Sequence, residues 1–353
     1  MKKIVIVFLA LMFGVTVVNG VSGKQPLIIT ENLLSAKAAF PSAIIADHRV
    51  VNYVRFDMIP EENITNAKNS LHIAYGHTSH GSQIVTGMTG LIAFKESQNG
   101  TAGLYDFNNG GADGALDFHD YFVSGDLGNP DRITWSNRTR TYLDDPANAD
   151  VNVVMWSWCG QVSSASEEDI ELYLSLMSSL ENDYPNVTFV YMTGHTDGTG
   201  LEGNLHIRNE QIRNYCKANN KVLFDFADIE SYDPDGNYYG DKHCNDNCDY
   251  DSNNDSTLDA NWAIEWQNAH PGEWYDCTSA HSQPLNANMK AYAAWWLWAT
   301  LAGWNTTTIP PTSNPTPPTN ITPTFPVPTI LIVMGTVGSL ATIVLIRNDR
   351  KRR

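Results

Sequence analysis

The amino-acid sequence predicts an α/β fold, a three-layer sandwich built on a mostly parallel sheet. Apolar stretches of strand length alternate with amphipathic stretches of helix length. Residues 151–156 form an almost continuous apolar run, which is typical of a strand covered by helices on both faces. The connections between these stretches are short, and such alternation favours parallel strand–helix units.

Each element has its own pattern. Apolar runs predict strands over residues 71–75, 151–156, 187–192 and 221–226. Apolar residues at helical spacing predict helices over residues 167–180, 205–218 and 286–301, the last being rich in Ala and Trp. All of these elements lie within residues 24–304, a length that suits one large domain.

Both ends of the chain differ from this domain. Lys2 and Lys3 precede an apolar run and then small residues, which predicts a secretory signal peptide over residues 1–23. Residues 305–326 are rich in Thr and Pro and predict an extended stalk. The uncharged residues 327–346 are long enough to span a membrane, and the basic residues 347–353 favour a cytoplasmic tail. We therefore expect an exported domain, anchored by its C-terminus at the extracellular face of the cell membrane.

The end of the chain also resembles a known sorting signal. Thr324-Phe325-Pro326-Val327-Pro328, an apolar segment and a basic end are similar to the PEF-CTERM class of archaeal signals, which have Glu at the position of Thr324. The resemblance implies that a sortase-like enzyme removes the segment and attaches the protein to a lipid. A membrane anchor that stays in place is the alternative.

The charge of the chain excludes one class of partner. The sequence has 22 basic and 39 acidic residues, a formal net charge of −17. Without the signal and tail segments, which together hold seven basic residues and one acidic residue, the net charge is −23. Such a surface repels nucleic acid, so we do not expect it as a partner. Sequons for N-glycosylation of an exported protein begin at Asn63, Asn99, Asn137, Asn186, Asn254, Asn305 and Asn320.

Gly, His and hydroxyl residues gather where the predicted strands end. The first three strands run into Gly76-His77-Thr78-Ser79-His80, Ser157-Trp158-Cys159-Gly160-Gln161 and Thr193-Gly194-His195-Thr196-Asp197, and His281 precedes the last helix. Ligands bind beyond the carboxyl ends of parallel strands, so these residues predict one site. Its chemistry fits nucleophilic acyl transfer, in which His activates a hydroxyl group and backbone N–H groups of a Gly-rich turn hold the oxyanion.

This layout resembles the SGNH/GDSL hydrolase superfamily, whose domains are flavodoxin-like. Gly76-His77-Thr78-Ser79 stands where that family has Gly-Asp-Ser, and Gly160-Gln161 stands where it has Gly-x-Asn-Asp. His281, followed by Pro284 and Asn286, matches the region where the family's catalytic His opens the last helix. The resemblance implies Ser79 as the nucleophile, His281 as its base, and Gly160 and Gln161 at the oxyanion. The position of the family's Asp is Thr278 here, and Asp276 is the nearest acid.

Several of these candidates have a simpler alternative. Ser79 could cap the following helix, with Ser82 as the alternative nucleophile. His195 and Asp197 complete the triad, bind a metal, or form a hydrogen-bonded turn. The two histidines beside Ser79, His77 and His80, are either polar site residues or ordinary loop residues.

The five cysteines are too few for a disulfide scaffold in a chain of this size. One bridge among Cys244, Cys248 and Cys277 is expected outside the cell, and a zinc site at Cys244 with His243 is the alternative. Cys159 is interpreted as a small buried residue, because no basic group lies near it in the sequence to deprotonate it.

Acidic residues and tryptophans are both concentrated near the end of the domain. Alternating oxygen donors predict a Ca²⁺ site, with a solvated acidic loop as the alternative, at Asp249, Asp251, Asn253 and Asp255. Helical spacing predicts that Trp295 and Trp298 are core residues. A second group either holds sugar rings or forms a packed lid, and it comprises Trp262, Trp266 and Trp274.

These observations favour a surface-tethered serine hydrolase, an esterase acting on O-acyl groups of glycans or similar esters, that requires no cofactor. The expected partner is a carbohydrate or an acylated small molecule. A catalytically silent domain of the cell surface, one that binds glycan or belongs to the envelope, is the alternative.

Overall fold

The computed structural model describes residues 40–52 and 56–305. The predicted signal peptide, membrane segment and basic tail lie outside these residues, as does the stalk apart from Asn305. Within the described ranges, no helix is both long enough and apolar enough to cross a membrane.

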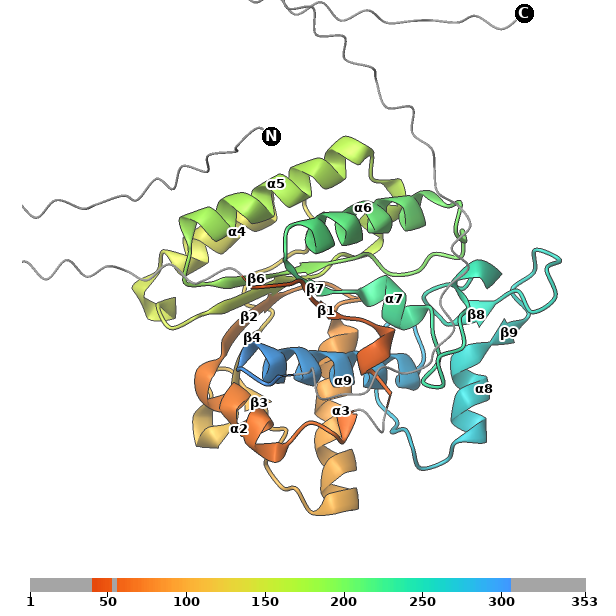
Figure 1. Cartoon of the computed structure of the whole chain (residues 1–353), viewed down its shortest axis with the longest axis horizontal. Coiled ribbons are helices and arrows are strands. Elements are labelled where there is room, and N and C mark those ends of the chain that lie inside the picture. Colours follow the sequence, from red (N-terminus) through yellow and green to blue (C-terminus); the bar gives the residue numbers. More distant parts are fainter. Residues whose placement is uncertain (1–39, 53–55, 306–353) are drawn as a thin grey trace, which may run out of the picture.

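A seven-stranded parallel sheet forms the centre of the domain (Figure 1). Its strand order is β1-β7-β6-β5-β2-β4-β3, and every neighbouring pair is parallel. The strands are β1 (Ile44–Ala46), β2 (His72–Gly76), β3 (Phe107–Asn108), β4 (Leu116–Asp120), β5 (Val153–Trp156), β6 (Thr188–Met192) and β7 (Val222–Phe224). The order β4-β2-β5-β6-β7 is the 2-1-3-4-5 order of flavodoxin-like folds. The predicted α/β class is confirmed.

Helices cover both faces of the sheet and complete the three layers (Figure 1). One face carries α4 (Thr134–Leu143), α5 (Glu167–Asp183) and α6 (Asn204–Ala218); the other carries α2 (Glu61–Ser70), α3 (Ser82–Asn99) and α9 (Pro284–Leu301). At one end lie α7 (Phe226–Glu230), α8 (Trp262–Ala269) and a small antiparallel pair, β8 (Asp249–Tyr250) and β9 (Ala260–Asn261). Short 3₁₀ turns are η1 (His48–Val50), η2 (Ala112–Gly114), η3 (Pro146–Asn148), η4 (Gly160–Ser164) and η5 (Gly240–Lys242).

The predicted elements agree closely with the observed ones, and local chemistry explains their ends. Helix α5 begins with a capping box, in which Ser166 and Asp169 each accept a backbone N–H of the other. The predicted strand 221–226 is wrong at its end, because β7 stops at Phe224. Asp225 caps α7 there by accepting the N–H of Asp228, so the chain turns into a helix two residues early.

The core consists of the central strands and α9. All residues of β5 and β6 are buried, as the apolar runs predict. Trp295 and Trp298 are fully buried on α9, which confirms the core prediction. Trp262 and Trp266 are also buried, so they pack inside the domain rather than present an exposed surface for sugar rings.

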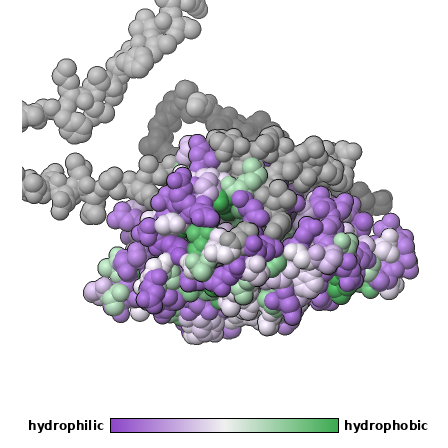
Figure 2. Space-filling model, turned by 90° about the horizontal axis from the view of Figure 1, so that it is seen from below, coloured by the Kyte–Doolittle hydropathy of each residue, from purple (hydrophilic) through white to green (hydrophobic). Residues whose placement is uncertain are grey.

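On the face that Figure 2 shows, hydrophilic residues dominate and hydrophobic residues occur in small groups.

Gly81, at the start of α3, allows a close approach between two loops. A Cβ atom at this position would lie 2.2 Å from Ser157 Oγ and 2.4 Å from His77 Cβ. Only a residue without a side chain fits this contact. The loop after β2 therefore packs directly against the loop after β5, and this packing brings the candidate residues together.

Candidate active site

The candidate site lies where the chain order of the sheet reverses. Strand β2 lies between β4 and β5, so the chain leaves it toward one side of the sheet and later returns on the other. The loops beyond such a switch point form the binding crevice of open α/β sheets. His80 follows β2 and Cys159 follows β5, so both lie at this point.

A thiol, an imidazole and a carboxylate form a connected row here. The Nδ1 atom of His80 lies 3.2 Å from the Sγ atom of Cys159. The Nε2 atom of the same ring lies 2.9 Å from Oδ2 of Asp246. His80 is buried and Cys159 and Asp246 are partly exposed, so solvent reaches both ends of the row. This is the arrangement of nucleophile, base and orienting acid that activates a side chain for attack.

The electrostatics of the row favour a charged thiolate. The hydrogen bond to His80 is the main cause that lowers the pKa of Cys159 to about 6, with burial opposing it and Ser79 adding to it. Burial alone would lower the pKa of His80, but its hydrogen bonds to Asp246 and Cys159 raise it to about 9. Between these two values, thiolate and imidazolium coexist as an ion pair.

The carboxylate at the far end of the row stays ionised. Burial alone would raise the pKa of Asp246, but the hydrogen bond from His80 and the nearby histidines hold it below its ordinary value. The negative charge of Asp246 therefore faces the imidazolium of His80 throughout the pH range in which the ion pair exists.

Two further histidines stack on His80. The ring of His195 lies 3.8 Å from that of His80 with an interplanar angle of 4°, and the ring of His281 lies 4.5 Å away at 18°. One face of an imidazole cannot hold two rings at these distances, so they cover opposite faces. Nδ1 of His195 donates to the carbonyl oxygen of Thr196 at 2.7 Å, because a carbonyl can only accept. The two neighbouring rings fix the plane of His80.

Ser79 lies in the site but does not contact the predicted base. Its Oγ atom is 3.3 Å from Sγ of Cys159, and no hydrogen bond joins it to His281 within the described residues. It is not the side-chain cap of α3 either, because Gly81 occupies that position without a side-chain hydrogen bond. Ser82 is a helix residue whose hydroxyl donates to the carbonyl oxygen of Ser79.

Gly160 and Gln161 support Cys159. A Cβ atom at Gly160 would lie 3.7 Å from Nε2 of His195, so this glycine borders the stacked rings. The side-chain oxygen of Gln161 accepts the backbone N–H of Cys159 at 2.9 Å. Its amide nitrogen donates to Asp126 at 3.0 Å, and Asp126 also accepts the hydroxyl of Thr78 at 2.6 Å. Gln161 therefore ties the loop after β5 to the loop after β2.

Asp276 and Asp197, the two acids named from the sequence, lie apart from this row. Asp276 is exposed, and its carboxylate has no hydrogen-bond partner among the residues that the structure describes. Asp197 accepts the N–H and the hydroxyl of Thr199 and so forms a hydrogen-bonded turn, one of the predicted alternatives. His77 pairs with Asp120 at 2.8 Å.

The roles of Cys159, His80 and Asp246 do not follow from the sequence pattern. Cys159 had no basic neighbour in the sequence, yet His80 reaches it from 79 positions away. Asp246 lies only three positions before Asp249, the first of the predicted calcium ligands, and nothing in the sequence links it to His80. The signal that could have found the thiol is its position, because it follows a buried strand on the edge where the histidine loop was already expected.

The site also offers ligands for a metal ion. One donor atom from each of His80, Asp246 and His281 lies within 4.8 Å of the other two. Two similar groups occur elsewhere in the described part of the chain, one comprising Asp47, His48 and Asp228 and the other His72, Asp117 and Asp150. In all three groups a histidine nitrogen and a carboxylate oxygen already lie within hydrogen-bonding distance of each other. An ion would have to replace these hydrogen bonds.

The predicted calcium ligands do not form such a group in the described ranges. Asp251 is buried, and its two oxygens accept backbone N–H groups of four following residues, Asn253, Asn254, Asp255 and Ser256. The two oxygens of Asp249 accept side-chain amides of Asn245, Asn247 and Asn261. The calcium site stays a prediction.

All five cysteines are free thiols in the structure, so the expected bridge among Cys244, Cys248 and Cys277 is absent there. Cys244 and Cys248 are buried, and the sulfur of Cys244 donates to the carbonyl oxygen of Glu230. Burial raises the pKa of each of these thiols, to about 12 in Cys277. They are therefore protonated at neutral pH, unlike Cys159.

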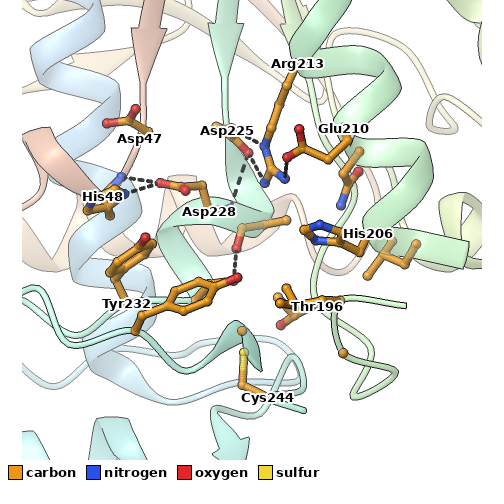
Figure 3. Close-up of a pocket in the computed structure, with 18 of the residues that line it drawn as sticks. Asp47, His48, Thr196, His206, Glu210, Arg213, Asp225, Asp228, Tyr232 and Cys244 are labelled. Carbon is orange, nitrogen blue, oxygen red and sulfur yellow. Dashed lines mark hydrogen bonds and ion pairs between the residues drawn. The ribbon is translucent and has the colours of Figure 1, made fainter. Parts of the chain in front are cut away.

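A cavity of about 660 Å³ lies beside the site, beyond the ends of β1 and β7 (Figure 3). Several of its charged side chains pair with one another. Arg213 donates to Asp225 at 2.6 and 2.8 Å and to Glu210 at 2.9 Å, and His48 faces Asp228 at 2.5 Å. Cys159 and His80 do not line this cavity.

The cavity and the site share two loops. Thr196, which follows His195, and Cys244, which precedes Asp246 by two positions, both line the cavity. The N–H of Gly198 donates to the carbonyl oxygen of Cys244 at 3.1 Å and joins the two loops.

Comparisons with protein-family models, curated proteins and solved structures found no match to this chain.

Proposed function

We propose that the domain is a cysteine-dependent hydrolase that transfers an acyl group from an ester to water. One observation carries the proposal: a single imidazole, that of His80, joins the thiol of Cys159 to the carboxylate of Asp246. The depressed pKa of the thiol and the raised pKa of the imidazole support it, because the thiolate is the attacking form of cysteine.

The reaction runs in two halves. The thiolate of Cys159 attacks the ester carbonyl carbon, and the leaving alcohol takes the proton of the His80 imidazolium. The thioester that forms is then attacked by water, whose proton returns to His80 as the thiolate leaves. Gly160 opens a helical turn, and the first N–H groups of a helix have no acceptor within it, so its N–H is the candidate donor to the oxyanion. Asp246 orients the ring and faces its positive charge.

Cys159 replaces Ser79 as the proposed nucleophile, while the reaction class implied by the SGNH resemblance is kept. The hydroxyl of Ser79 faces the sulfur and not an imidazole. In this assignment Ser79 donates a hydrogen bond to the thiolate, which agrees with its share in lowering the pKa of Cys159. We retain the expected substrate class, an O-acyl ester of a glycan or a similar molecule, and the surface location with its C-terminal anchor.

Metal-dependent hydrolysis is a second candidate, favoured by the convergence of His80, Asp246 and His281. In that case an ion would activate water, and Cys159 would not form a covalent intermediate. The two candidates differ in their response to a chelator, and they also differ in whether a thiol reagent stops the reaction.

Labelling of the full-length protein tests the proposal. Iodoacetamide should modify Cys159 with a rate that rises through a pH of about 6, since the thiolate forms there. Cys277 is the matched control, because it is also partly exposed but has a pKa raised to about 12. Peptide mass spectrometry after alkylation at pH 7 should therefore find Cys159 modified and Cys277 intact.

Four outcomes would contradict this proposal. Equally slow alkylation of Cys159 and Cys277 would show that Cys159 is not a thiolate at pH 7. Labelling of Ser79 by a fluorophosphonate probe would restore the serine assignment. Hydrolysis of p-nitrophenyl acetate that survives alkylation but stops with a chelator would favour the metal candidate. With no turnover of this ester or of acetylated sugars, the silent binding domain becomes the better explanation.

A further inference from the structure

A buried ion pair lies behind the candidate site. Lys290 on α9 and Glu230 at the end of α7 are both fully buried, and Nζ of Lys290 lies 2.6 Å from Oε1 of Glu230. Nζ also donates to the side-chain oxygen of Gln83 and lies 3.7 Å from the ring centre of Phe226. Removing two charges from water is costly, and apolar side chains of similar volume often serve stability equally well. The pair therefore calls for a reason other than stability.

Hydrogen bonds lead from this pair to the loop of His195. The second carboxylate oxygen of Glu230 accepts the backbone N–H of Thr196 at 2.8 Å and its hydroxyl at 3.2 Å. Thr196 follows His195 directly, and its carbonyl oxygen accepts Nδ1 of that ring. One carboxylate thus fixes both the backbone and the ring of the histidine that covers one face of His80.

A second route leads to the loop of His281. Gln83, which accepts from Lys290, donates its amide to the carbonyl oxygen of Ala280 at 2.5 Å. Glu230 also accepts from Asn286 at 3.2 Å, and Asn286 donates to the hydroxyl of Ser282 at 2.7 Å. Ala280 and Ser282 are the two neighbours of His281. The backbone there is held in the left-handed region, with φ of 62° at His281.

We propose that Lys290 and Glu230 are positioning residues, which hold the rings of His195 and His281 against His80 and so keep His80 directed at Cys159. Gln83 lies on α3, three residues after His80, so all three histidine loops connect to the same pair. This inference rests on the proposed function, since it assigns a task to the pair only if the His80–Cys159 contact is catalytic.

The double variant Lys290→Met/Glu230→Gln tests the pair. It removes both charges together, because one charge left alone in the core would strongly destabilise the protein. The carboxamide oxygen can still accept from Thr196. We expect a folded protein by circular dichroism, an ester hydrolysis rate at least tenfold lower, and a pH midpoint of Cys159 alkylation about one unit higher. The pH midpoint of alkylation is the decisive measurement. If the pair were purely structural, its loss would lower the melting temperature and leave the midpoint unchanged.

The control is a second buried lysine, Lys95, which pairs with Asp57. Lys95 lies on α3, the helix that also carries Gln83. Lys95→Met should lower the melting temperature and leave the alkylation midpoint of Cys159 in place. If the double variant does not fold, Gln83→Leu, which cuts the route to Ala280 without adding a charge, should move the midpoint in the same direction.

The two proposals fail in different ways. A wild-type midpoint near that of an ordinary thiol would refute the proposed function. The positioning role alone would be refuted if the wild type has a low midpoint and the folded variants keep it. The variants compared are the double variant and Gln83→Leu.

Discussion

The loop after β5 and the segment from Cys244 to Cys277 both carry thiols at the same end of the domain, but they make opposite use of them. In the first, a buried imidazole from another strand loop lowers the pKa of Cys159 to about 6. In the second, burial outweighs every contact that lowers a thiol pKa, so the pKa of each cysteine is raised. The pKa of a thiol therefore depends on what the fold places beside it, not on how many cysteines lie near it in the sequence.

The acidic residues of the same segment differ in a parallel way. Asp246 faces His80 across 166 positions of sequence, whereas Asp249 and Asp251 bind amide and N–H groups within 12 positions of themselves. Long-range contacts thus give one carboxylate a role in the site, and local contacts give its neighbours a role in shaping the loop.

The largest effect should come from the thiols themselves. Cys159→Ala should lower the rate of ester hydrolysis by a factor of about 10⁴ or more, since the attacking group is removed. Cys277→Ala, the matched change in the second region, should leave the rate near that of wild type. Both rates are measured with p-nitrophenyl acetate on full-length protein. Equal activity of the two variants would abolish the distinction between the regions.

A smaller effect should separate two carboxylates of one loop. Asp246→Asn should reduce the rate by a factor of about 10² to 10⁴, because the imidazole loses its orienting charge. It should also move the alkaline limb of the pH–rate profile, expected at about 9 in wild type, to lower pH, since the bond to Asp246 helps to raise the pKa of His80. Asp249→Asn is the control and should change neither reading. An unchanged alkaline limb in Asp246→Asn would count against the row of three residues.

The smallest effect concerns the acidic loop. Asp251→Ala removes the acceptor of four backbone N–H groups and should lower the melting temperature without altering hydrolysis. Titration of wild type with millimolar Ca²⁺ decides the calcium prediction in the same assay. A rise in melting temperature that a chelator reverses would establish the ion, because a ligand of the folded state stabilises it. If Ca²⁺ does not change the melting curve of the wild type, the calcium prediction is wrong and the loop is held by its own backbone hydrogen bonds.

The location of the site was largely predictable from the sequence. The roles of its residues were not. His80, Ser79, Cys159, His195 and His281 all lie on loops that the strand pattern placed at one edge of the sheet. Which of them touch was not predictable, because parallel strands bring together residues that are distant in the sequence. The contact of Ser79 with sulfur depends on the loop packing at Gly81, which no periodic pattern records. His281 stacks on His80 from a third loop, which is equally hidden in the sequence.

The class of fold, its central strands and main helices, and the edge at which polar residues gather are all predictable from the amino-acid sequence. These follow from apolar periodicity and caps, which act over a few residues. The pairing of His80 with Cys159 and Asp246 is visible only in the folded domain, as is the contact of Lys290 with Glu230 behind them. The physical reason is that a pKa and a buried ion pair depend on distances of a few ångströms between loops and helices, and the chain sets those distances only after its strands are ordered.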